Sequence, residues 1–569
     1  MQLLYLWISE YRNFKNKGLN FNSQYEFDLD LVNKKLTYKK NENFIENFFG
    51  NQIQEITGIV GKNGVGKSNI LELVNYSIKN PNEVGLESFF LIFKTDENNF
   101  VRYDYNFLLN IENKTSLDIQ IQIHPGKIKG ITNVFFSNIF DTRRYLFSDD
   151  VQDLSTNRSS LTSFGRNIYN FQQDEIKNQV KFISSPYFKS IKNNDLPMPE
   201  HLIFSTNLAT NISHKIRRAA DNYNLPELNE FYNKYQKRYK DSSSNKTFFL
   251  IVSFYCLIYF LIDPNEDDYE EKRFSSQRID PVQISKIKFF IDEILVANFD
   301  IIELHHFILT TFLDFLENNF PNKNKLVKFL KNSFNSDFYN ALEVKPITKG
   351  RYSKQRQEFL LPFRNKKCQN FVKEYLDVFR NNNAFQLEWS GISTGQLAFY
   401  NLFSRFHSII KNVKQRNVLI TIDEGDLYFH PNWQLNFLDF LIKGLSEIFG
   451  DRKLQIILTT HSPFLVSDLP KNNLIFIDRK DEDLLIVKPE NIEIETFAAN
   501  IYALYSKAFF LENGTISEFA YKKLSQLKKD IQSNVNKEDT LKLINQIGDT
   551  VIKKQYDLYL KKHSNETDK

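Results

Sequence analysis

The chain contains Gly61-Lys62-Asn63-Gly64-Val65-Gly66-Lys67-Ser68, which fits the pattern G-x-x-x-x-G-K-S of a phosphate-binding P-loop. Its glycines let consecutive backbone N–H groups turn inward around a phosphate chain. Lys67 offers a positive charge to the β- and γ-phosphates, and Ser68 offers a hydroxyl to Mg²⁺. The stretch predicts a binding site for a nucleoside triphosphate.

The residues around this loop support the same interpretation. The apolar run 56–60 before it predicts a short buried strand, and residues 70–76 after it can begin a helix whose N-terminus favours an anion. A glycine-rich loop that matched the pattern by chance would need neither neighbour. The expected nucleotide contacts are Asn63, Gly64, Val65, Gly66, Lys67, Ser68 and Asn69.

The amino-acid composition limits the classes of protein to which the chain can belong. The 569 residues suffice for several domains, and 41% apolar residues can form a large core. Because 73 basic residues nearly balance 69 acidic ones, net charge gives no argument for nucleic-acid binding. Cys256 and Cys368 are too few for a disulfide framework or a multi-cysteine metal site, as expected for a cytoplasmic protein.

One apolar run, residues 248–262, raises the question of a membrane. It is shorter than the roughly 18–20 residues that span a bilayer, so we expect a buried core helix. The apolar start at residues 3–8 lacks the basic region of a signal peptide. We therefore expect a cytoplasmic chain with no membrane partner.

The pattern of apolar residues changes along the chain. Residues 1–150 alternate like strands around the P-loop, and residues 151–384 are mainly helical. A second α/β pattern covers residues 385–495, and residues 496–569 form a helical tail. The sequence thus predicts an α/β nucleotide-binding domain that a large helical insertion splits in two.

A second part of the site is expected in the C-terminal lobe. The apolar run 418–422 ends in Asp423 and Glu424. A buried strand that delivers Asp423 to Mg²⁺ is a Walker B element, and Glu424 is then placed as the general base for water. Alone, such a run is more typical of an ordinary strand that ends in a solvated acidic turn. The P-loop elsewhere in the chain favours the metal site.

Two further segments have both a structural and a functional interpretation. His461 follows an apolar run, so it is either a lone structural histidine or a side chain that senses the γ-phosphate. Ser393, with Gly395 and Gln396 after it, precedes a long helix over residues 397–411. It either caps this helix or presents the helix N-terminus to a phosphate.

In this order, the segments resemble the ABC-type ATPases related to SMC, RecF and the OLD-type nuclease ATPases. The run 393–396 is similar to the end of L-S-G-G-Q, with Thr394 in place of a glycine, and 423–434 is similar to D-E-P-E-x-x-L-H-P-x-x-Q, with Gly425 in place of proline. The segment 459–465 resembles the family's switch-histidine segment, and 11–15 resembles its I-x-N-F-[RK] start.

The tail narrows the resemblance. Residues 496–501 and 508–520 look like the C-terminal segment of PtuA-type ATPases of Septu and retron-associated antiphage systems. The resemblance implies ATP and Mg²⁺ as ligands, and a homodimer or higher homo-oligomer in which Ser393, Gly395 and Gln396 act on nucleotide bound by the other protomer. It places Asn138 at the Q-loop position near the metal. It also implies a nucleotide-gated regulator with a separate HNH-type nuclease as partner.

Two other functions remain open from the residues. A RecF- or SMC-like DNA-repair or chromosome-maintenance ATPase would need DNA contacts, and DNA or retron RNA is a candidate partner. The basic residues that could supply them are Lys349, Arg351, Lys354, Arg356, Arg364, Lys366 and Lys367. A transporter-type subunit fits less well, because the ATPase heads of transporters are compact and lack a helical insertion of this size.

Overall fold

The computed structural model describes most of the chain as two compact units. The described residues are 1–109, 111–140, 143, 145, 147–158, 168–191, 198–206, 211–240, 247–262, 281–320, 323–333, 345–347, 358–379, 385–480, 483–507, 516–533 and 537–566. The first unit comprises residues 1–59 and 66–465, and the second comprises residues 60–65 and 466–569. Two predicted segments, 349–357 of the basic stretch and 508–515 of the tail motif, lie outside the described residues.

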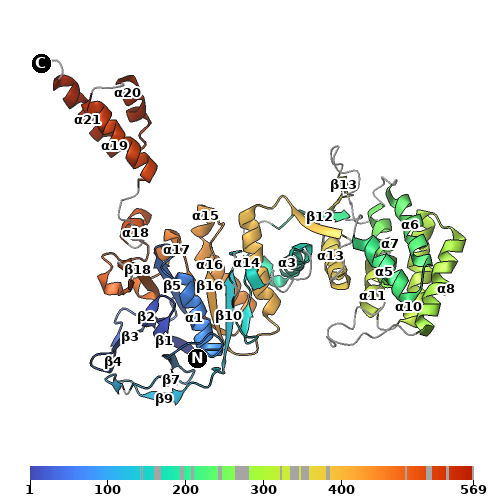
Figure 1. Cartoon of the computed structure of the whole chain (residues 1–569), viewed down its shortest axis with the longest axis horizontal. Helices are drawn as coiled ribbons and strands as arrows, with labels where there is room; N and C mark the ends of the chain where they lie inside the picture. The colour runs from blue at the N-terminus through green and yellow to red at the C-terminus, as the bar shows by residue number, and fades with distance from the viewer. Residues whose placement is uncertain are drawn as a thin grey trace. The chain divides into compact units, whose positions relative to one another are not determined.

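A parallel sheet carries the candidate site in the first unit. Its strands follow the order β11 (Val151–Asp153), β10 (Ile131–Ser137), β16 (Asn417–Asp423), β17 (Lys453–Thr459) and β5 (Ile53–Gly61). Strand β16 is buried along its whole length, which explains its continuous apolar run. Helix α1 (Lys67–Lys79) packs on β10, β16 and β17 (Figure 1). Parallel strands bring their carboxyl ends to one edge, where α/β proteins bind ligands.

Two smaller sheets cover the N-terminal part of this unit. The strands of the first are β2 (Phe14–Asn20), β1 (Gln2–Tyr11), β6 (Phe89–Lys94), β7 (Phe100–Tyr105) and β9 (Ile119–Ile123); those of the second are β3 (Tyr25–Asp30), β4 (Lys35–Lys40) and β8 (Glu112–Asn113). Aromatic side chains such as Trp7, Phe27 and Phe90 fill the core between them. The turn between β1 and β2 contributes to the site described below.

The middle of the chain is mainly helical. Its helical elements are α3 (Ile168–Ile183), α4 (Pro186–Ile191), α5 (Asn211–Tyr223), α6 (Glu227–Lys240), α7 (Thr247–Ile262), α8 (Pro281–Ala297), α9 (Ile301–Phe307), the π-helical turn η2 (Ile308–Phe312), α10 (Leu313–Asn319), α11 (Asn324–Ser333) and α13 (Lys366–Val378). Residues 248–261 of α7 are buried, which confirms a core helix in the apolar run. In the described ranges, no helix is both long and apolar enough to cross a membrane.

A four-stranded sheet and helix α14 lead from the helical middle back to the site. The strands follow the order β13 (Lys345–Ile347), β14 (Glu358–Pro362), β12 (His201–Thr206) and β15 (Phe385–Ser390). Helices α14 (Thr394–Ile409), α15 (Pro431–Gln434), α16 (Phe437–Phe449) and α17 (Pro463–Ser467) follow. Helix α14 packs against both α3 and α16, so it contacts the helical middle and the C-terminal lobe.

The second unit contains a β-hairpin and the C-terminal helices. Its elements are η4 (Lys471–Asn473), β18 (Leu474–Lys480), β19 (Asp483–Val487), η5 (Pro489–Asn491), α18 (Ile501–Lys507), α19 (Glu518–Gln532), α20 (Lys537–Gln546) and α21 (Thr550–Glu566). Leu527, Ile531 and Ile544 form a small apolar core between α19 and α20, and residues of α21 pack against it. In the same unit, Lys62 of the P-loop pairs with Asp478 at 3.3 Å.

Candidate nucleotide-binding site

The P-loop turns directly into helix α1. Gly66 is the N-cap of this helix and has φ 100°, in the left-handed region that favours glycine. A Cβ atom at residue 66 would also lie 2.7 Å from Nδ2 of Asn13. Lys67 and Ser68 are therefore the first two residues of α1, where free backbone N–H groups attract phosphate. Asn63, Gly64 and Val65 lie in the turn before it.

The turn between β1 and β2 holds the start of α1 in place. Arg12 donates from Nη2 to Oε2 of Glu72 at 2.8 Å and from Nη1 to Oε1 at 3.1 Å. Arg12 Nη1 also donates to Oδ1 of Asn69 at 2.6 Å, and Asn69 Nδ2 donates to Oδ1 of Asn13 at 3.0 Å. Burial raises the pKa of Glu72, whereas Arg12 opposes this shift. This clamp was not predicted, although residues 11–15 matched the family's opening pattern.

Asp423 lies at the carboxyl end of β16 and joins the two halves of the site. Ser68 Oγ donates to Asp423 Oδ1 at 2.9 Å, and Thr459 Oγ1 donates to the same oxygen at 2.7 Å. Asp423 is fully buried, and burial raises its pKa, whereas the bonds from Thr459 and Ser68 lower it. Ser68 and Asp423, each predicted as a Mg²⁺ ligand, are thus hydrogen-bonded to each other.

The second oxygen of Asp423 tests whether the site fits Mg²⁺. Asp423 Oδ2 is buried and has no hydrogen-bond partner in the part of the chain that the structure describes. A buried carboxylate oxygen is costly to leave unpaired, and carboxylate and hydroxyl oxygens are ligands that Mg²⁺ prefers. Asp423 and Ser68 therefore fit the ion. Arg143 Nη2 lies 4.0 Å from Oδ2, a nearby positive charge that the sequence did not reveal.

Asn138 lies directly after β10, next to the same strand end. Ser137, the last residue of β10, pairs in register with Asp423. Asn138 is 9% exposed, and its Nδ2 is buried without a hydrogen-bond partner among the described residues. This placement leaves the Asn138 amide available to a ligand at the strand edge, and the Q-loop role of Asn138 stays a prediction.

Glu424 and His461 face each other beside Asp423. His461 Nε2 lies 3.5 Å from Glu424 Oε1. The pKa of Glu424 is lowered, chiefly by the hydrogen bond from His461 and against the effect of burial, so Glu424 remains a carboxylate. Its backbone has φ 48°, and its N–H donates to Thr459 Oγ1 at 3.0 Å. A single threonine hydroxyl therefore orients both acidic residues.

Burial and the neighbouring carboxylates change the pKa of Lys67. Its side chain is buried, and burial lowers its pKa to about 8, although Glu424 and Asp423 act in the opposite direction. The two carboxylates favour the charged form of Lys67, and this cation at the N-terminus of α1 is suited to bind a phosphate chain. The structure thus brings Lys67, Ser68, Asp423, Glu424 and His461 together at one edge of the sheet.

A second buried acid supports the loop that carries His461. Thr460 Oγ1 donates to Asp426 Oδ2 at 3.1 Å and accepts from Ser462 N at 2.9 Å. Burial raises the pKa of Asp426 to about 6, whereas the backbone and Thr460 bonds lower it. These contacts connect the chain after β16 to the chain after β17, on either side of the Glu424–His461 pair.

Ser393, Gly395 and Gln396 lie at the N-terminus of α14. Ser393 is the N-cap of α14 and forms a capping box, in which its Oγ accepts from Gln396 N at 3.2 Å and its N–H donates to Gln396 Oε1 at 3.0 Å. Ser393 is exposed, and a Cβ atom on Gly395 would meet the carbonyl of Tyr428 at 3.3 Å. The structural interpretation as a capped helix is therefore confirmed.

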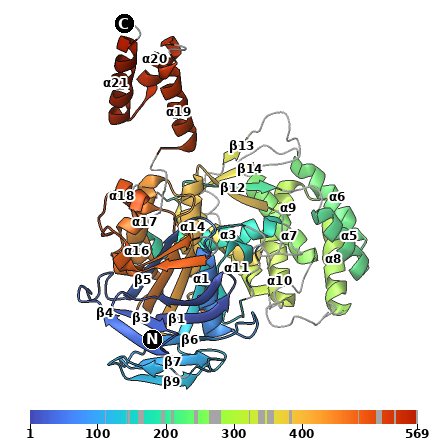
Figure 2. The same cartoon turned by 60° about the vertical axis from the view of Figure 1, so that its left-hand side comes forward.

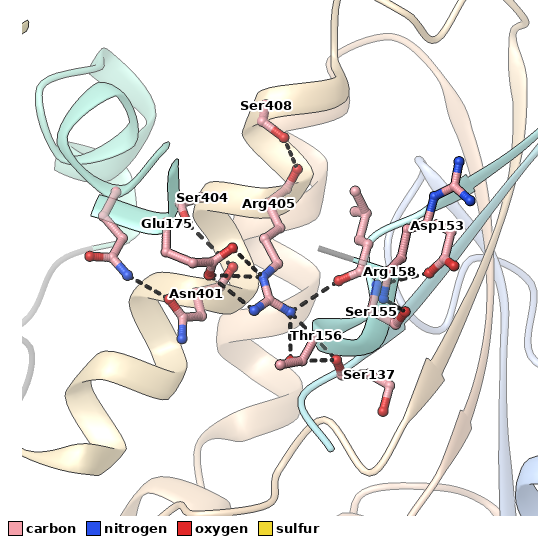
Figure 3. Close-up of polar contacts among 12 residues, drawn as sticks. Ser137, Asp153, Ser155, Thr156, Arg158, Glu175, Asn401, Ser404, Arg405 and Ser408 are labelled. Atoms are coloured by element: carbon pink, nitrogen blue, oxygen red, sulfur yellow. Dashed lines mark hydrogen bonds and ion pairs between the residues drawn. The ribbon is translucent and has the colours of Figure 1, made fainter. Parts of the chain in front are cut away.

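Arg405 connects α14 to the strand edge and to the helical middle (Figure 3). Its Nε donates to Glu175 of α3 at 3.0 Å, and Nη2 lies 3.0 Å from the same carboxylate. Its Nη1 donates to the carbonyl of Leu154 at 3.0 Å and to that of Ser137 at 3.4 Å. Arg405 is 3% exposed. The one sequence signal for it was a charged residue inside the apolar run of α14.

Comparison with known proteins agrees with this geometry. Residues 43–466 match the AAA ATPase domain family. The chain belongs to this family. The match includes the P-loop, Asp423, Glu424 and His461, so a mixed α/β ATPase domain is established for this part of the chain.

Three relatives refine the comparison. The chain is 33% identical over 121 residues to the Septu protein PtuA of Bacillus thuringiensis, which covers 18% of this chain and 29% of PtuA. It is 28% identical over 156 residues to the retron Ec83 probable ATPase of Escherichia coli (26% of each chain) and 26% identical over 201 residues to protein ea59 of Escherichia phage lambda (33% of this chain, 35% of ea59). The predicted PtuA-like resemblance is confirmed. The chain spans about a third of these relatives or less.

Proposed function

We propose that this chain is an ABC-type ATPase that binds and hydrolyses ATP with Mg²⁺ and acts as a nucleotide-gated scaffold for a separate effector nuclease in bacterial antiphage defence. The observation that carries the proposal is the pairing of Glu424 with His461 beside the Ser68–Asp423 bond. The similarity to the Septu protein PtuA and the retron Ec83 probable ATPase supports the role in defence.

The chemistry follows from the groups at the strand edge. Lys67 and the first N–H groups of α1 bind the phosphates. Bound Mg²⁺, held by Ser68 and Asp423, would neutralise phosphate charge. Glu424, a carboxylate, accepts a proton from water as the water oxygen bonds to the γ-phosphorus and the bond to the β-phosphate oxygen breaks, which yields ADP and phosphate. His461, 3.5 Å from Glu424, orients this base and the γ-phosphate.

The exposed N-terminus of α14 is proposed to act on the nucleotide of a second protomer. In the capping box, Ser393 Oγ serves as an acceptor, so its hydroxyl hydrogen remains able to bond to a phosphate oxygen. Gly395 and Gln396 lie in the same first turn. In this split ABC-type arrangement, residues 1–150 and 385–495 form the ATPase head, 151–384 the insertion and 496–569 the tail. ATP then favours the paired form, which is a population shift.

A pair of variants tests the ATPase and its gating. Glu424→Gln removes the base but keeps the shape of the side chain, so we expect at least about 100-fold slower hydrolysis and an ATP-dependent dimer. Lys67→Ala should abolish both nucleotide binding and the dimer. Light scattering with and without ATP and Mg²⁺ measures the dimer. Unchanged turnover in Glu424→Gln would refute the role of the base.

The partner is tested separately. Deletion after Phe519 removes most of the C-terminal helices, and we expect it to abolish capture of an HNH-type nuclease encoded beside this chain. If the truncated chain still captures the nuclease, the tail is not the docking surface. Strongly salt-dependent binding of DNA by the ATPase alone would instead favour a repair function. In the described part of the basic stretch, Arg364 pairs with Glu200 at 2.8 Å.

A further inference from the structure

Helix α8 exposes a row of apolar side chains. Val282, Phe289 and Val296 are 58%, 73% and 86% exposed. Their spacing of seven residues is close to two helical turns, so they share one face. The opposite face is buried and contains Ile287, Phe290, Ile291 and Ile294. Figures 1 and 2 both show α8 at the border of the group of helices that it forms with α5, α6 and α7.

Charged side chains border this apolar row in a specific order. Lys286 precedes Phe289 by three residues, and Glu293 follows it by four. At about 100° per residue, both lie on the same side of the row, whereas Ser285 and Asp292 lie on the other side. Lys286 and Glu293 are exposed, and neither has an ion-pair partner among the described residues. The charge pattern therefore reverses its sign about Phe289.

We propose that α8 is a self-association surface, on which α8 of a second copy of this chain packs antiparallel about a two-fold axis at Phe289. In this arrangement Phe289 meets its own equivalent, and Val282 meets Val296 of the second copy. Lys286 comes opposite Glu293 of the second copy, with an offset of about 1.5 Å along the helix, and the symmetry repeats the pair. An interface of this kind is self-complementary in both shape and charge.

The charges select the antiparallel direction. In a parallel pair, the side of the row with Lys286 would face the side with Ser285 and Asp292. Lys286 would then lie level with a serine, and Asp292 of the second copy would be about 9 Å further along the axis. Only the antiparallel pair gives Lys286 a carboxylate at its own level. The apolar row excludes water at the centre, as in a coiled-coil seam.

This surface is distinct from the proposed ATP-dependent contact. It does not include α1 or the N-terminus of α14, and it needs no nucleotide. One helix pair lies below the roughly 1,200 Å² that separates transient from stable interfaces, so it is weak alone. Together with a second two-fold contact in the same chain, the α8 surface links dimers into larger assemblies. The second contact raises the effective concentration of one α8 surface near another.

Cysteine cross-linking tests the register in the full chain without ATP. Phe289→Cys should cross-link to itself with a short bismaleimide, because two residues on the axis face each other. Val282→Cys alone should not, since its equivalents lie about 21 Å apart along the axis, but a mixture with Val296→Cys should. Phe519→Cys on α19 is the matched control, as Phe519 is also 73% exposed. The native Cys256 and Cys368 are buried.

Equal cross-linking of Phe289→Cys and Phe519→Cys would overturn the proposal. The proposal would also be overturned if Val282→Cys alone cross-linked as readily as its mixture with Val296→Cys, because that result indicates parallel helices.

Charge reversal provides a second, independent test. Lys286→Glu and Glu293→Lys should each weaken nucleotide-free self-association at least about threefold in sedimentation experiments, because each places like charges opposite one another twice. The double variant Lys286→Glu/Glu293→Lys should regain nucleotide-free self-association. Phe289→Glu should abolish association, whereas Phe519→Glu should not. The interface is refuted if the double variant self-associates no more strongly than either single variant, or if Phe289→Glu self-associates normally. ATP hydrolysis by the same preparations is measured separately.

Discussion

Ser68 and Asp423 are hydrogen-bonded at 2.9 Å although 355 residues separate them in the chain. One is in the first turn of α1, and the other ends β16. The bond requires that the two segments on either side of the helical middle fold into one sheet with one helix on it. Buried Asn75 of α1 extends this link, because it donates to Thr421 Oγ1 of β16 at 2.8 Å.

The Ser68–Asp423 pair should determine metal affinity. Ser68→Ala removes one proposed ligand and the bond that orients the other, so we expect about 10–100-fold weaker binding of Mn²⁺ as a Mg²⁺ probe in the presence of ATP. Electron paramagnetic resonance measures the free Mn²⁺. Ser77→Ala is the matched control on the same helix, because Ser77 Oγ donates to the carbonyl of Leu73 at 2.7 Å within α1. Equal metal affinity of the two variants would contradict the assignment.

Thr459 should matter for turnover because its hydroxyl contacts both Asp423 and the backbone of Glu424. Thr459→Val keeps the shape but removes the donor to Asp423 and the acceptor for Glu424 N–H. A buried N–H left unsatisfied costs about 1–3 kcal/mol, and both acids lose their orientation. We expect kcat to fall about 10-fold or more with little change in ATP affinity. Thr132→Val, on the amino-terminal half of β10, should leave steady-state kinetics unchanged.

Asp426 should give stability a distinctive pH dependence. Burial raises its pKa in the folded chain from 3.8 to about 6, so between these values the folded state binds more protons than the unfolded state. Its contribution to stability therefore falls as pH rises through this window. Asp426→Asn stays neutral, and its stability relative to the native chain should rise by about 1–3 kcal/mol from pH 4 to pH 7.

Urea unfolding at several pH values measures this difference. Asp451→Asn, at an exposed position after α16, is the control and should show no comparable trend. A constant difference between Asp426→Asn and the native chain across this range would contradict the raised pKa.

The Arg405–Glu175 pair should stabilise the contact between α14 and α3. Their side chains are 4% and 11% exposed, so Arg405→Met or Glu175→Gln leaves a buried charge without its partner and should cost about 3–5 kcal/mol of unfolding free energy. The double variant Arg405→Met/Glu175→Met should lose less unfolding free energy than the two single variants lose in sum. Denaturant unfolding measures this coupling. The exposed Lys443–Asp439 pair is the control, and its loss should cost about 0.3–0.5 kcal/mol.

Much of the site follows from local sequence. The P-loop needs glycine where φ is positive and where the chain approaches Asn13, so its conformation is encoded in adjacent residues. The strand that ends in Asp423 is encoded in a continuous apolar run, because both its faces are buried. The continuous apolar run of α7 likewise predicted a core helix, and the serine before α14 gave a helix cap as one of two interpretations of Ser393.

Only the tertiary structure decided which polar residues meet. Arg12 and Glu72, Thr459 and Asp423, and Arg405 and Glu175 lie far apart in the chain, and no spacing rule pairs them. Their partners depend on strand order and helix packing, because a buried polar group must find a donor or acceptor wherever the fold brings one near. The sequence by itself determined the phosphate loop and the strand that faces it. The packing of α1, α3 and α14 around the sheet decided how those parts are held, since buried charges are tolerated only where the whole fold places an opposite charge beside them.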